Sequence, residues 1–103
     1  MAKQPETLLK ERVLADLRAL PSVYVVKIQQ VAIRGTPDIL ACIAGRFIAI
    51  ELKRDEKEKP APIQRYALAK ISNAGGLSFV VHPLNWPGVL AELRRLAYLD
   101  RAG

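Results

Sequence analysis

The sequence predicts an α/β fold in which helices flank a mixed sheet. Three observations carry this prediction. Apolar residues recur at helical spacing in three segments, β-branched and aromatic residues gather in four shorter ones, and the two kinds of segment mix along the chain. The expected element order is α-β-β-β-α-β-α. A chain of 103 residues has the length of one domain with one core, so we expect a single domain over residues 1–103.

Three helices are expected, over residues 5–20, 62–73 and 87–99. Pro21 ends the first, and Gly75-Gly76 follows the second as a terminator. Each helix presents an apolar stripe that would face the core. In the first and third helices the stripe residues are Leu9, Val13, Leu17 and Leu20, and then Val89, Leu90, Leu93, Leu96 and Ala97.

Four strands are expected, over residues 23–29, 38–43, 46–53 and 77–81, the last of them buried. The dipeptide Ala44-Gly45 separates the second strand from the third. This spacing indicates a hairpin with a two-residue loop.

The loop sets the register of this hairpin. If Ala44-Gly45 forms the loop, Ile43 faces Arg46, and the numbers of paired residues keep a constant sum along the ladder. By that sum Asp38 lies opposite Glu51, with both side chains on one face of the sheet.

Side chains alternate along a strand, so Lys53 shares the face of Glu51 and Leu52 points to the other. Away from these charged residues both faces are apolar, and we expect both to be covered, with Cys42 packed inside the hairpin. The two sets are Ile39, Ala41, Ile43, Ile48, Ile50 and Leu52 on one face, and Leu40, Cys42, Phe47 and Ala49 on the other.

Asp38, Glu51 and Lys53 would therefore meet where both strands reach the end of the core. Two neighbouring carboxylates repel each other, and keeping both ionised near a core is costly unless a cation joins them. Carboxylate oxygens suit Mg²⁺ or Mn²⁺, and the main-chain carbonyl of Leu52 could supply a further ligand. Such a metal activates water and polarises a phosphodiester, while the lysine orients the water or stabilises developing charge. The alternative is that Lys53 simply neutralises two carboxylates at a strand end.

Two polar residues in first helical turns point to the same place. Glu6 precedes the apolar stripe of the first helix, and Gln64 lies on the face of Leu68 and Ile71 in the second. Each has a simpler explanation, as a carboxylate favoured by the helix dipole and as a helix-end amide. Together, beside an ionic strand end, they indicate a polar site.

Composition restricts the partners. Sixteen Lys and Arg residues against ten Asp and Glu give a net charge of +6, which suits a polyanion such as a nucleic acid. Arg34, Arg54 and Arg65 lie nearest the motif and are expected to contact DNA. The single cysteine excludes a Cys-based zinc site and fits a reducing cytoplasm. No apolar run is long enough to span a membrane, and no secretion signal is visible.

At these residues the sequence resembles a VRR-NUC domain, a family of the PD-(D/E)xK nuclease superfamily. The fold of that superfamily is called restriction-endonuclease-like, and the resemblance implies an α-β-β-β-α-β core followed here by a C-terminal helix. The matching stretches are Glu6, Arg34-Gly35-Thr36-Pro37-Asp38, Ile48-Ala49-Ile50-Glu51-Leu52-Lys53 and Gln64.

The resemblance assigns roles to these residues. Asp38 and Glu51 resemble the metal ligands of the family, and Leu52 resembles the position that coordinates through its main-chain carbonyl. Glu6 resembles the acidic residue of the first helix, which binds metal directly or through water.

Lys53 resembles the catalytic lysine, and Gln64 the glutamine that helps to order the catalytic site. The resemblance thus implies a Mg²⁺- or Mn²⁺-dependent endodeoxyribonuclease. The chain looks like the stand-alone, phage-type members, which are similar to small dimeric junction-resolving enzymes. That likeness implies a homodimer acting on branched or four-way (Holliday) junction DNA in the cytoplasm, or in the host cytoplasm if a phage encodes it.

Two other functions remain open. A non-catalytic nucleic-acid-binding module on the same fold would need the positive surface but not the Asp, Glu and Lys. A structural or inhibitory protein-interaction domain would use the apolar third helix and would show no affinity for DNA.

Overall fold

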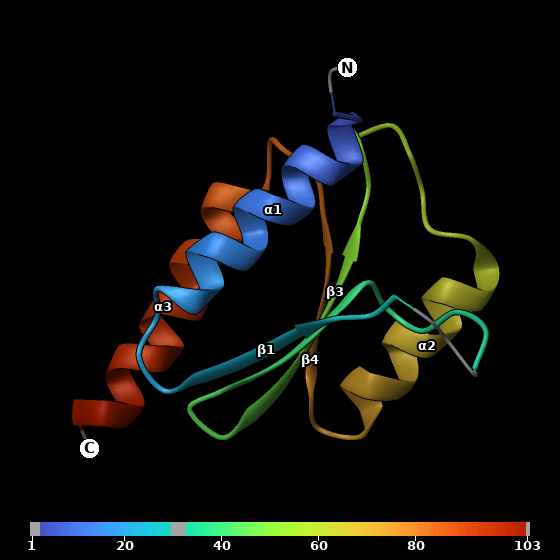
Figure 1. Ribbon diagram of the computed structural model, residues 1–103. Helices are drawn as coiled ribbons and strands as arrows, with labels where there is room; N and C mark the ends of the chain where they lie inside the picture. The colour runs from blue at the N-terminus through green and yellow to red at the C-terminus, as the bar shows by residue number, and fades with distance from the viewer. Residues whose placement is uncertain (1–2, 30–32, 103) are drawn as a thin grey trace.

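The computed structural model describes residues 3–29 and 33–102, and its elements follow the predicted order (Figure 1). The second helix and the last strand have the predicted bounds. The remaining bounds differ by one to three residues at some ends. The elements are α1 (Pro5–Arg18), β1 (Val23–Lys27), β2 (Ile39–Ile43), β3 (Arg46–Leu52), α2 (Pro62–Asn73), β4 (Leu77–Val81) and α3 (Trp86–Ala102).

The four strands form one mixed sheet in the order β1-β2-β3-β4. The pairs β1–β2 and β2–β3 are antiparallel, and β3–β4 is parallel. A parallel pair needs a crossover connection, which α2 supplies. The mixed sheet and the α/β class predicted from the sequence are therefore confirmed.

The hairpin between β2 and β3 has the predicted loop and register. Ile43 pairs with Arg46, and the constant sum continues to the pair Ile39 and Ile50. Ala44 and Gly45 have φ angles of 50° and 86°, the combination that a two-residue hairpin loop of type I′ requires. The loop thus sets which residues of β3 face the core.

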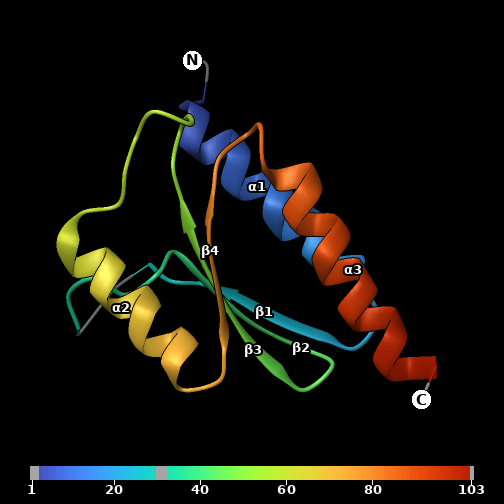
Figure 2. The ribbon, with the colours of Figure 1, turned by 180° about the vertical axis from the view of Figure 1, so that it is seen from behind.

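Helices α1 and α3 cover one face of the sheet and α2 covers part of the other (Figures 1 and 2). The core lies under α1 and α3, where the apolar face of the hairpin is buried as expected. Trp86 is fully buried there, and its indole N–H donates a hydrogen bond of 2.8 Å to Asp16 Oδ2. This bond satisfies the one polar atom of the ring within the core.

The expectation that both faces of the sheet are covered is wrong for β1, β2 and the start of β3. Helix α2 packs on β3 and β4, so Cys42 is exposed rather than packed, Phe47 is 48% exposed and Tyr24 is 73% exposed. Strand β4 also departs from the prediction: it is an edge strand, and of its residues only Val81 is fully buried.

Among the described residues, none of the helices combines the length and apolarity needed to cross a bilayer.

Candidate active site

The end of β3 carries the first part of the site. Alternation along this strand buries Leu52 in the core under α1 and α3 and turns Glu51 and Lys53 toward α2. Glu51 is only 2% exposed, which is unusual for a carboxylate. The register predicted from the hairpin loop therefore brings an acidic and a basic side chain together beside α2.

Asp38 lies one residue before β2, and both its main chain and its side chain are anchored. Its carbonyl accepts a hydrogen bond of 2.8 Å from the N–H of Ile28. Its Oδ2 accepts one of 2.7 Å from the N–H of Leu52, so the carboxylate ties the start of β2 to the end of β3. A carboxylate held by a backbone donor in this way has a defined orientation.

The loop before Asp38 depends on Gly35. This residue has a φ of +85°, and a Cβ built on it would lie 2.6 Å from the carbonyl oxygen of Ile63 in α2. Only glycine tolerates both conditions without a shift of the backbone. The close approach places the loop, and with it Asp38, against the first turn of α2.

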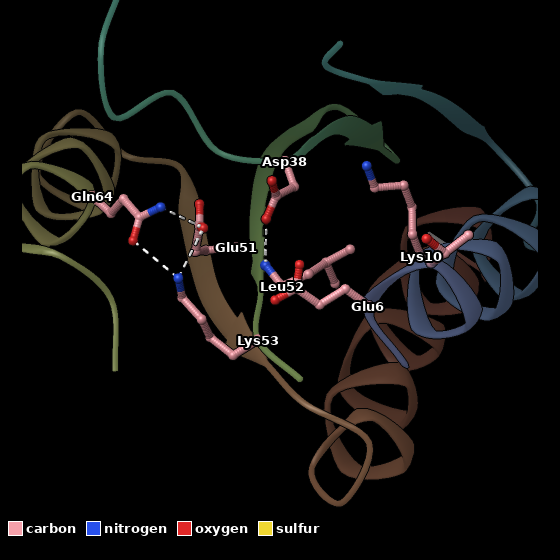
Figure 3. A pocket seen from close by; sticks show the side chains of 8 residues that line it. Glu6, Lys10, Asp38, Glu51, Leu52, Lys53 and Gln64 are labelled. Carbon is pink, nitrogen blue, oxygen red and sulfur yellow. Dashed lines mark hydrogen bonds and ion pairs between the residues drawn. The ribbon is translucent and has the colours of Figure 1, made fainter. Parts of the chain in front are cut away.

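Gln64 in that first turn links the charged residues (Figure 3). Its Nε2 donates a hydrogen bond of 2.9 Å to Glu51 Oε2, and its Oε1 accepts one of 3.1 Å from Lys53 Nζ. The same Oε1 accepts the N–H of Ala61 at 2.8 Å, which caps the helix. Lys53 Nζ also lies 3.5 Å from Glu51 Oε2. The lysine is therefore held between an amide and a carboxylate.

The pKa of Glu51 is raised from 4.5 to about 7. Burial is the largest cause, the negative charge of Asp38 is the second, and the positive charge of Lys53 opposes both. The neighbouring carboxylates therefore interact as the sequence predicted, and the lysine does not fully offset the cost of the buried charge. A cation beside them would lower this cost.

Helix α1 completes the pocket from the other side of the sheet end. A cavity of about 250 Å³ is lined by all six predicted catalytic and metal-binding residues. Thr7 and Lys10 line it as well, although the sequence analysis assigned neither of them a specific role in the site. Lys10 lies four residues after Glu6, on the same face of the helix, and this spacing was the signal that could have found it. The lining residues are Glu6, Thr7, Lys10, Asp38, Glu51, Leu52, Lys53 and Gln64.

The three arginines predicted to contact DNA lie outside this cavity. Arg34 lines an adjacent cavity of about 350 Å³ that shares Asp38 and Gln64 with the first. The Nε of Arg54 lies 3.9 Å from a carboxylate oxygen of Glu58. Arg65 donates a hydrogen bond of 3.3 Å to the carbonyl of Pro60. Of the three, Arg34 is the one whose cavity adjoins the site.

The oxygen donors of the pocket fit a hard divalent cation. Asp38 and Glu51 are neighbouring carboxylates, and the Leu52 carbonyl belongs to the residue between Glu51 and Lys53. Within residues 3–29 and 33–102 there is no group of three His, Cys, Asp or Glu side chains close enough to hold a metal. Glu6 therefore does not form a three-carboxylate set with Asp38 and Glu51.

The structure thus combines a mixed sheet between helices with an acidic pair and a lysine at the end of its central hairpin. No family profile matches the sequence, and no curated protein matches it. A solved structure described as a VRR_NUC domain superposes with a TM-score of 0.75 at 26% identity, over 87% of this chain and 97% of that one. A second, described as a VRR_NUC domain protein, superposes with a TM-score of 0.71 at 15% identity, over 96% and 93%.

These two likenesses extend over most of the chain. The resemblance to VRR-NUC domains and the restriction-endonuclease-like architecture, both indicated by the sequence, are therefore confirmed.

Proposed function

We propose that the protein is a divalent-metal-dependent endonuclease that hydrolyses DNA phosphodiester bonds. The observation that carries this proposal is the convergence of Asp38, Glu51 and Lys53 in one pocket of a VRR-NUC-like fold. A domain that only bound nucleic acid would need positive surface, and would gain nothing from a buried carboxylate with a raised pKa.

Asp38 and Glu51, with the carbonyl of Leu52, are the residues that would hold Mg²⁺ or Mn²⁺. Once bound, the ion supplies a water of lowered pKa and polarises the phosphodiester. Glu6 lies on the α1 side of the pocket and would act on the ion through a water molecule.

Lys53 has the role of electrostatic stabilisation. Its ammonium is held by Gln64 and Glu51, so it does not have to reorganise as negative charge develops around phosphorus. Gln64 keeps both the lysine and Glu51 oriented, which makes it a positioning residue.

The substrate is DNA, and branched or four-way junction DNA in particular. The net charge of +6 favours binding to phosphates, with Arg34 next to the site and Arg54 and Arg65 further along the loop and α2. A homodimer with two-fold symmetry would place two sites for paired cuts across a branch. The single cysteine fits action in a reducing cytoplasm.

The test is a cleavage assay with Mg²⁺ or Mn²⁺ on linear, flap and four-way junction DNA. We expect wild-type protein to cut, with preference for the branched substrates, and Asp38→Asn to be inactive. Asp55→Asn, which changes a partly buried loop residue outside the pocket, is the matched control and should cut normally. Binding of DNA without any divalent-dependent cleavage would overturn the proposal and favour the non-catalytic binding module.

A further inference from the structure

The pocket contains a second lysine whose environment differs from that of Lys53. Lys10 of α1 is partly buried and lies on the side of the pocket opposite Lys53 and Gln64 (Figure 3). Lys53 is engaged by Gln64 and Glu51, whereas Lys10 makes no ion pair or side-chain hydrogen bond with any residue in the described part of the chain. One ammonium is therefore constrained, and the other is available to a ligand.

The charges of the pocket indicate what that ligand is. Three carboxylates and two ammonium groups line the cavity, which leaves one formal negative charge when all are ionised. A divalent cation at Asp38 and Glu51 changes this to one positive charge. A single phosphodiester group carries the one negative charge that neutralises it.

The position of the adjoining cavity indicates the direction in which a bound DNA strand would run. It shares Asp38 and Gln64 with the central pocket and extends to Arg34 in the loop before β2. A backbone that passes over Asp38 would thus meet Lys10 on the α1 side and Arg34 on the other. Both are long cationic side chains of the kind that contact phosphates.

We propose that Lys10 binds a non-bridging phosphate oxygen of the DNA strand that lies in the pocket, opposite Lys53. This inference rests on the proposed nuclease function and assigns the two lysines different tasks. Lys53 acts on the reacting phosphate from a fixed position. Lys10 holds the strand and contributes to affinity.

The experiment measures DNA binding as a function of salt concentration, in an Asp38→Asn background that prevents cleavage. Lys10→Met removes the charge but keeps the apolar stem, and Lys10→Arg keeps the charge. Lys3→Met is the matched control, because Lys3 is exposed, pairs with Glu11 at 2.6 Å and does not line the pocket. We expect Lys10→Met to reduce the slope of log affinity against log salt by about 1, and Lys10→Arg to restore it.

In the otherwise wild-type protein, Lys10→Met should raise KM by about 10-fold with a smaller change in kcat, the pattern of a lost binding contact. Lys3→Met should change neither the salt slope nor KM. If Lys10→Met unfolds, Lys10→Gln replaces it in both measurements.

The two proposals fail separately. A wild-type protein that cleaves, with Lys10→Met equal to Lys3→Met in salt slope and KM, overturns the role of Lys10 alone. A wild-type protein that does not cleave overturns the nuclease proposal, while a reduced salt slope for Lys10→Met would still support the phosphate contact.

Discussion

The two faces of the sheet differ in what they contribute, although β3 supplies residues to both. Ile48, Ile50 and Leu52 point into the closed layer under α1 and α3, where they join the apolar core. Glu51 and Lys53 point to the α2 layer, which covers only part of its face. Stability and candidate chemistry are therefore separated by a single step along one strand, because side chains alternate.

The most direct test of this separation between the two faces is to substitute a residue of the candidate site. Lys53→Ala should lower kcat/KM for DNA cleavage by about 10³-fold or more, as expected when a preorganised charge is removed. The variant should still fold, because the lysine is not part of the apolar core, although its unfolding temperature should fall since Glu51 loses its ion-pair partner. Cleavage by Lys53→Ala at the wild-type rate would contradict the mechanism.

The closed layer should respond in the opposite way. Trp86→Ala should lower the free energy of unfolding by about 3–5 kcal/mol, since it empties a fully buried site and leaves Asp16 without its donor. Denaturant unfolding measures this, and activity per folded molecule should not change. A loss below about 1 kcal/mol would show that this layer is not the main source of stability.

The pH dependence of stability tests how much free energy of folding is lost by burying the charged Glu51 carboxylate. The pKa of Glu51 rises from 4.5 to about 7 on folding, so the folded protein binds more protons than the unfolded chain between these values. The metal-free protein should therefore lose stability as pH rises through this range. The loss should be about 3 kcal/mol, at roughly 1.4 kcal/mol for each tenfold change in proton affinity.

Glu51→Gln is the control for this measurement. It keeps an acceptor for Gln64 but cannot ionise, so its stability should be flat over the same pH range and should exceed that of the metal-free wild type at pH 8. Added Mg²⁺ should restore stability to the wild type and have no such effect on Glu51→Gln. A wild-type profile that rises with pH would contradict the assignment of Glu51 as a carboxylate destabilised by burial.

Gln64 has an intermediate position, because it bridges the site and caps α2. Gln64→Ala should lower the cleavage rate by about 10–100-fold and the free energy of unfolding by about 1–2 kcal/mol. Gln64→Glu keeps an acceptor for Lys53 and Ala61 but cannot donate to Glu51. Full activity of Gln64→Glu would show that the hydrogen bond from Gln64 to Glu51 is not needed for cleavage.

The smallest effect is expected on the open half of the sheet. Cys42 is exposed there, so Cys42→Ser should change the free energy of unfolding by no more than about 0.5 kcal/mol and leave cleavage unchanged. Chemical denaturation checks this. A loss above 1.5 kcal/mol would mean that the face is covered in solution.

The local residue pattern was sufficient to predict the hairpin and the residues that its register aligns. The dipeptide Ala44-Gly45 admits the two positive φ angles of a tight loop, and the loop alone sets the register that aligns Asp38 with the end of β3. Coverage of the second face was not predictable in the same way. The residue pattern of an apolar strand face is the same whether or not a helix packs on it. Cys42 and Phe47 were therefore wrongly expected to be covered.

Lys10 shows a second property that could not be predicted from the sequence, namely which residues a side chain meets in the folded protein. Its spacing from Glu6 placed both on one side of α1, but only the packing of that helix beside the end of the sheet brings them to Asp38 and Glu51.

The sequence by itself determined the order of the elements, the hairpin register and the identity of the acidic pair and lysine, because these follow from local backbone preferences and from alternation along a strand. The tertiary structure decided which face each helix covers, how Gln64 joins Glu51 to Lys53, and which pocket lysine has no partner among the residues that the structure describes. Those properties depend on contacts between segments far apart in the chain, and on the exposure that such contacts leave, which no local pattern encodes.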